Sequence, residues 1–104
     1  MKALSQLLFL FLILSIPLQA ARAPDWAERA RSEATDAMRK GQWEEALKVF
    51  QRVDQTMSHR DYLSTEWFGW FVYHRGVAEL RLEKYQDAMK SFERYYRTSS
   101  MRHG

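Results

Sequence analysis

Two stretches of this chain carry the same pattern of residues. Residues 40–50 are "KGQWEEALKVF" and residues 82–92 are "LEKYQDAMKSF". In each, an aromatic residue is followed three positions later by Ala and seven positions later by Phe. The two alanines, Ala46 and Ala88, lie 42 positions apart. A repeat at a fixed spacing indicates two copies of one structural unit within the 104 residues.

Apolar periodicity indicates that each unit is a pair of helices. Asp25 is suited to cap a helix that follows Pro24, and alanines then recur at steps of three and four residues until Gly41 ends the helix. A second helix is expected to begin near Trp43 and to bury one stripe of apolar side chains.

The second unit shows the same organisation. The segment "SHRD" at residues 58–61 has the form of a capping box and predicts the start of a longer helix that runs to about Leu82. A last helix is expected from about Gln86, fraying over residues 98–104. No stretch alternates with period two for long enough to predict a strand. We therefore expect an all-α fold of two antiparallel helical hairpins, one over about residues 25–57 and the other over about residues 58–97.

Positions that match at the 42-residue offset predict how each hairpin packs. A small residue in the first helix and an Ala in the second let the two helices lie close together. The Phe fills the space beyond that contact, and the aromatic residue at the turn covers the gap between the helices. These repeat-defining positions are Ala34, Trp43, Ala46 and Phe50 in the first hairpin and Gly76, Tyr85, Ala88 and Phe92 in the second.

This pattern resembles the tetratricopeptide repeat, a hairpin of about 34 residues with a small residue in its first helix and an A-x3-F motif in its second. The resemblance covers essentially all of the chain after residue 20 and is most specific in "RGVAELRLEKYQDAMKSFER". It implies a stack of hairpins, an α-solenoid fragment, whose concave side holds a peptide or a partner protein. The alternative is an unrelated four-helix bundle.

The chain departs from the family pattern in several places. Ala30 and Val72 stand where the family has a large aromatic residue, and Glu79 stands where it commonly has Tyr. Ser58 and Ser100 stand where it has Pro. The offset of 42 residues also exceeds the family period by about eight, and we expect the extra residues to lengthen the third helix by about two turns.

Residues 1–20 have the layout of a secretory signal peptide. A single cation, Lys2, precedes an apolar run over residues 7–16, and Pro17 and small residues follow it. We expect cleavage after Ala20. An uncleaved membrane anchor is the alternative, although the apolar run is shorter than the roughly 20 residues that cross a bilayer.

Residues 21–104 are then expected to form one exported helical domain. The chain contains no Cys, so packing must hold this domain together although export leads to an oxidising compartment. A protein of the bacterial periplasm fits this composition at least as well as a secreted one. The formal net charge of the chain is +3 and its arginines alternate with acids, so nucleic acid is not an expected partner.

The segment "WFGWFVYH" at residues 67–74 concentrates aromatic residues on all sides of one helix. A helix that is apolar all round must be covered all round, and two hairpins are not expected to cover it fully. The segment "TMSHRDYLS" at residues 56–64 can fold over part of this helix. The remaining aromatic residues indicate an interface, where Trp and Tyr are common anchors.

The family resemblance places a binding groove on the first helix of each hairpin, on the side away from the second helix. An acidic group of a bound peptide would lie near Arg31 and an apolar side chain near Trp70, because one end of this side is charged and the other apolar. The family's clamp for a peptide carboxyl terminus is not matched. The expected partner-binding residues are Trp70, Tyr73, Val77, Leu80, Arg31, Thr35 and Met38, with Glu28 beside them.

No pattern in the chain predicts an enzyme, a cofactor or a metal site. The tripeptide "HRD" at residues 59–61 is better explained as a helix start than as a catalytic loop. The function that we expect is an exported tetratricopeptide-type interaction module or adaptor that binds a protein or peptide. The alternative is a structural or self-associating piece of a larger repeat array without a separate ligand.

Export with cleavage makes a direct prediction about the purified protein. The mature chain is expected to begin at Ala21. Intact-mass analysis of the exported product measures this, and a mass that retains residues 1–20 contradicts it.

Overall fold

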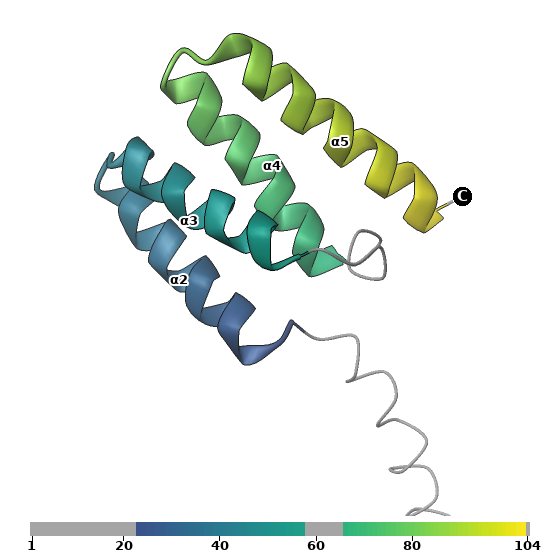
Figure 1. Cartoon of the computed structure of the whole chain (residues 1–104), viewed down its shortest axis with the longest axis horizontal. Coiled ribbons are helices and arrows are strands. Elements are labelled where there is room, and N and C mark those ends of the chain that lie inside the picture. Colours follow the sequence, from purple (N-terminus) through teal and green to yellow (C-terminus); the bar gives the residue numbers. More distant parts are fainter. Residues whose placement is uncertain (1–22, 58–65, 104) are drawn as a thin grey trace, which may run out of the picture.

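In the part of the chain that the structure describes, four helices follow one another side by side in chain order (Figure 1). The computed structural model describes residues 23–57 and 66–103. In these ranges the fold is all-α, as the sequence predicts, and the second hairpin packs on the first. The helices are α2 (Asp25–Arg39), α3 (Trp43–Thr56), α4 (Glu66–Arg81) and α5 (Tyr85–His103).

The bounds of α2 and α3, the end of α4 and the start of α5 agree with the expected ones, whereas the end of α5 does not. α5 continues to His103 instead of fraying from residue 98. Thr98 is buried, and its hydroxyl donates to the carbonyl oxygens of Arg94 at 3.1 Å and Tyr95 at 2.9 Å, which ties this turn to the preceding one. The predicted capping box and the predicted lengthening of the third helix fall on residues 58–65, outside the described residues.

The two helix–helix turns have the same hydrogen bonds at the 42-residue offset. In the first, the amide of Gln42 donates to the carbonyl of Ala37 at 2.9 Å. In the second, the amide of Lys84 donates to the carbonyl of Glu79 at 2.8 Å. Gly41, at φ 71°, and Glu83, at φ 61°, occupy the left-handed position of these turns. Both turns are therefore Schellman-type helix ends, which normally favour Gly at this position.

Small residues let the helices of each hairpin approach closely. Ala34 and Ala46 are fully buried between α2 and α3, and Phe50 is 1% exposed. In the second hairpin Ala88 is buried, and a Cβ atom at Gly76 would lie 2.7 Å from Cε1 of Phe92. That separation is too short for a carbon–carbon contact, so glycine is what allows the Phe92 ring to lie there.

The aromatic residues at the two turns differ in their surroundings. Trp43 is half-buried and lies under the guanidinium of Arg81, which is 5.2 Å from its ring centroid. Tyr85, its counterpart, is 57% exposed. The reason is positional, because α4 packs against α3 but no described helix follows α5.

The apolar helix α4 is covered more fully than expected, because it lies between α3 and α5 (Figure 1). Phe68 and Phe71 are buried, while Trp67 and Trp70 are half-buried. Among the aromatic residues of α4, only Tyr73 is exposed. The two hairpins thus bury Phe68 and Phe71, whereas Trp70 and Tyr73, the aromatic residues that the sequence analysis assigned to a partner, keep some exposed surface.

The left-handed position of Glu83 predicts that its replacement by Gly is stabilising. Glu83→Gly is expected to raise the unfolding free energy by about 1 kcal/mol, because a side chain disfavours this conformation. The matched change Gly41→Ala is expected to lower it by about 1 kcal/mol, since the site is spatially open and only the backbone conformation opposes a side chain. Urea denaturation of both variants tests the pair, and a loss of stability in Glu83→Gly contradicts the assignment of the turn.

Candidate functional site

The predicted partner-binding residues line two neighbouring helices. On α4, Tyr73 is 43% exposed and Leu80 is 49% exposed, whereas Trp70 and Val77 are half-buried. On α2, Arg31 is exposed, and the remaining predicted positions, Thr35 and Met38, are half-buried. We call the surface formed by Arg31, Trp70, Tyr73, Val77 and Leu80 the α2–α4 surface.

Trp70 of α4 contacts Arg31 of α2 and so joins the two helices of this surface. The guanidinium of Arg31, from α2, lies 4.6 Å from the centroid of the indole ring. The ring of Phe50, from α3, packs against the same indole in a T-shaped arrangement with ring centroids 6.0 Å apart. Trp70 therefore packs on the core through one part of its ring and remains partly accessible through another.

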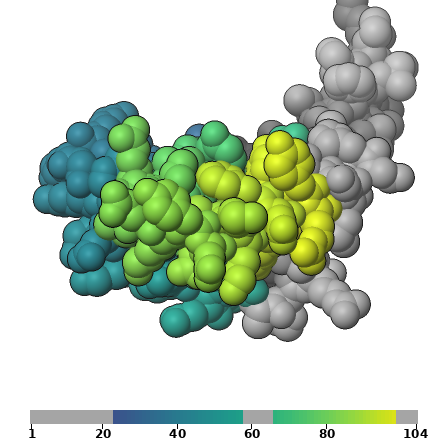
Figure 2. All heavy atoms as spheres, turned by 90° about the horizontal axis from the view of Figure 1, so that it is seen from above, coloured from purple at the N-terminus to yellow at the C-terminus, as the bar shows by residue number. Residues whose placement is uncertain are grey.

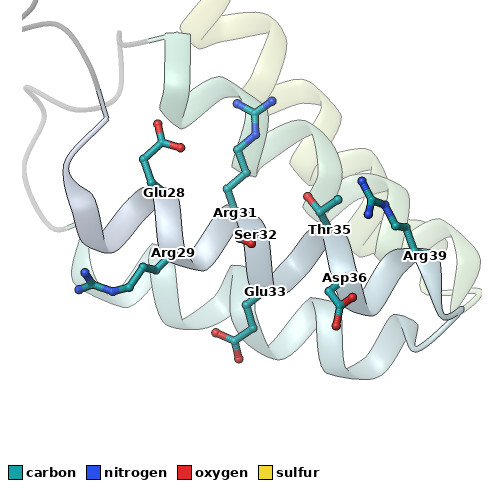
Figure 3. Close-up of a pocket in the computed structure, with 8 residues that line it drawn as sticks. All are labelled: Glu28, Arg29, Arg31, Ser32, Glu33, Thr35, Asp36 and Arg39. Carbon is teal, nitrogen blue, oxygen red and sulfur yellow. The ribbon is translucent and has the colours of Figure 1, made fainter.

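Arg31 carries a positive charge that is not neutralised within the described residues. It is exposed, and none of the ion pairs formed there includes it. In Figure 3, Glu28 and Arg31 extend from the same side of α2, whereas Arg29 and Glu33 extend from the other side. An open polar hollow of about 630 Å³ lies along these residues of α2. The Arg31 head group is thus held by an aromatic face and keeps its hydrogen-bond donors for an anion.

An aromatic hollow of about 260 Å³ adjoins Trp70 between α4 and α5. Tyr95 of α5 forms one wall, and its ring centroid lies 5.5 Å from that of Tyr73. The lining residues are Glu66, Gly69, Trp70, Tyr73, His74 and Tyr95. Its aromatic walls suit an apolar side chain.

His74 belongs to this aromatic cluster although the sequence analysis did not single it out as a binding residue. Its ring stacks on Trp70 with centroids 4.2 Å apart, and its Nδ1–H donates to the carbonyl oxygen of Trp70 at 2.9 Å. Burial lowers the pKa of His74 below its ordinary value of 6.5, and the positive charge of Arg31 lowers it further. The hydrogen bond to Trp70 opposes this shift. The spacing of Trp70 and His74, one helical turn apart, was the available sequence signal.

A second polar cluster joins three helices on the other side of α4. Asp54 of α3 accepts hydrogen bonds from Arg75 of α4 at 2.8 Å and from Arg94 of α5 at 2.8 Å. Glu79, which is 3% exposed, accepts from the Ser91 hydroxyl at 2.5 Å and from Arg75 Nε at 3.3 Å. Each carboxylate in this cluster has a partner, so we interpret the cluster as a structural connection rather than a ligand site.

Sequence reasoning missed this second cluster. Glu79 was noted only as a departure from the family pattern, and no periodicity marked Asp54. The pairing depends on how the second hairpin sits on the first, which a single-helix pattern does not contain.

No group of His, Cys, Asp and Glu side chains in residues 23–57 and 66–103 has an arrangement that suits a metal ion. In the same ranges, no helix combines the length and the apolar character needed to span a membrane.

Comparison of the chain with protein-family models, with curated proteins and with solved structures gave no match. The resemblance to the tetratricopeptide repeat therefore rests on the matched residues and on the repeated turn geometry.

The lowered pKa of His74 predicts a pH-dependent contribution to stability. The unfolded chain takes up a proton on this imidazole near pH 6.5, whereas the folded chain resists protonation until a lower pH. The His74 contribution to the unfolding free energy is therefore present above pH 6.5 and is lost as the pH falls through and below that value. His74→Gln removes this titration, so the stability of the variant is expected to vary less between about pH 7.5 and pH 5. Denaturation of both proteins at the two pH values measures the difference, and parallel pH profiles contradict it.

Proposed function

We propose that this protein is an exported interaction module of the tetratricopeptide type that binds a segment of another protein on its α2–α4 surface. The bound segment carries an acidic group, which pairs with Arg31, and an apolar side chain, which contacts Trp70 and Tyr73. Leu80 and Val77 extend the apolar part of the surface along α4.

The observation that carries this proposal is the placement of Arg31 over Trp70. A guanidinium that lies on an indole 4.6 Å from its centroid is oriented by the aromatic ring and is not engaged by a described carboxylate. A carboxylate of a partner that docks there gains a charge-assisted hydrogen bond. The same partner covers the accessible part of Trp70, and such half-buried aromatic residues are frequent binding hot spots.

The family part of the proposal is supported by internal repetition. Small residues at Ala34 and Gly76, and Schellman-type turns at Gly41 and Glu83, recur at the 42-residue offset. The export part is supported by the composition of residues 1–20, which lie outside the described ranges.

Selection of peptides tests the proposal without a known partner. Peptides selected from a random display library against the immobilised protein are expected to share an Asp or Glu a few residues from a large apolar residue. Arg31→Gln is expected to weaken binding of a selected peptide by about ten-fold or more, because a charge-assisted hydrogen bond is lost. Trp70→Ala is expected to weaken it by about 2 kcal/mol or more.

Arg29→Gln is the matched control, because Arg29 extends from the other side of α2 (Figure 3). This variant is expected to bind as the parent does. Circular dichroism separates a loss of binding from a loss of structure, which matters for Trp70→Ala because Trp70 also contacts Phe50. Selected peptides that bind Arg31→Gln and Trp70→Ala as tightly as the parent, with helicity unchanged, contradict the proposed surface.

A further inference from the structure

The outer side of α5 presents a stripe of large apolar side chains. Tyr85 is 57% exposed, Met89 is 64% exposed and Tyr96 is 72% exposed. Phe92 belongs to the same row, but it is half-buried because its ring packs on Gly76 of α4. These four residues follow one another at steps of three and four and therefore share one flank of the helix. Figure 2 views the molecule from this side, with α5 in light green to yellow nearest the reader. We call these four residues the α5 stripe.

The first hairpin shows what covers the equivalent stripe in this fold. At the 42-residue offset the α5 stripe corresponds to Trp43, Leu47, Phe50 and Asp54 of α3. Leu47 is 5% exposed and Phe50 is 1% exposed, because α4 packs on that side of α3. The α5 stripe is therefore the same packing surface, and within the described ranges no helix lies on it.

The chemistry of the two stripes differs at one position. Asp54 of α3 holds Arg75 and Arg94, which belong to the two helices of the next hairpin. Its counterpart on α5 is Tyr96. A surface that lacks this acid does not select a hairpin with arginines at those positions and favours an apolar or aromatic occupant instead.

A second copy cannot satisfy the α5 stripe by continuing the stack from head to tail. In that arrangement the α2 side of the second copy would occupy the place that α4 has on α3. Where α4 presents Phe71, α2 has Arg29, and where α4 presents Arg75, α2 has Glu33. Glu33 forms an exposed ion pair with Arg52 at 2.8 Å. Burying this pair and Arg29 against Tyr96 would remove water from charges that gain no partner there.

A two-fold arrangement avoids this cost because each copy presents its apolar α5 stripe to the other. We propose that two copies of this chain associate through their α5 stripes, with the two α5 helices antiparallel. Such an isologous interface is self-complementary by symmetry. None of the four residues of the α5 stripe is charged, so this arrangement buries no unpaired charge at the centre of the interface. This dimer leaves the α2–α4 surface outside the interface and does not depend on the proposed function.

Disulfide cross-linking tests the geometry directly, because the chain has no Cys of its own. In an antiparallel pair that meets through the α5 stripes, residues near the middle of the stripe lie close to their own copies. Met89→Cys is therefore expected to form a covalent dimer on mild oxidation of the protein recovered after expression of the full chain. Asp36→Cys, on the exposed side of α2, is the matched control and is expected to remain monomeric under the same conditions.

Two further results separate the alternatives. A cross-link between Met89→Cys and Arg29→Cys in a mixture, without self-cross-linking of either variant, indicates head-to-tail stacking and overturns the proposal. In sedimentation experiments without oxidation, the parent is expected to dimerise with rising concentration. Met89→Glu is expected to weaken the dimer by about ten-fold or more, because a charge is buried in an apolar interface. A parent that stays monomeric over the whole concentration range, or a dimer that Met89→Glu leaves unchanged, also overturns it.

Discussion

The carboxylate of Asp54 fixes how the second hairpin sits on the first. It is the acceptor for Arg75 and Arg94, so both helices of the second hairpin donate to one residue of α3. The rest of this contact is formed by apolar side chains such as Phe50, whose burial is favourable but not directional. Several positions of the second hairpin on the first would bury a similar apolar area. A charged, partly buried connection of this kind selects one of these positions. That position brings Trp70 of α4 beside Arg31 of α2.

The two ends of the stack have different chemistry. The α2 end carries Arg29 and the exposed Glu33–Arg52 pair, whereas the α5 end carries the exposed Met89 and Tyr96. Repeat arrays need polar surfaces at their ends to stay soluble, and only the α2 end meets that requirement within the described residues. The charged end disfavours head-to-tail stacking of copies, and the apolar end is the one where we propose that two copies associate. A peptide on the α2–α4 surface and a second copy on the α5 stripe would occupy separate sides of the molecule.

The helical hairpins were predictable from the sequence because their determinants are local. The spacing of apolar residues at steps of three and four predicts α2, α3 and most of α5 near their observed bounds. Gly41 marks the end of α2, and the repeated A-x3-F motif marks the second helix of each hairpin. The left-handed conformation of Glu83 could not be predicted from its residue type, because Glu rarely adopts it. Only the alignment of Glu83 with Gly41 indicates this conformation. The exposure of Tyr85 and the coverage of α4 depend on which helix lies next to which. The Asp54 connection was not predictable either, because its counterpart Tyr96 breaks the repeat at that position.

The coupling between Asp54 and Arg94 is the most direct measure of how the hairpins are joined. A double-mutant cycle with Asp54→Ala and Arg94→Ala, followed by urea denaturation, isolates this coupling from the separate effects of each change. We expect about 1 kcal/mol or more, because the pair is partly shielded from water and charge-assisted. The exposed pair Glu93–Arg97 on the same helix is the control and is expected to give only about 0.3–0.5 kcal/mol. A coupling between Asp54 and Arg94 no larger than that of the control contradicts the account.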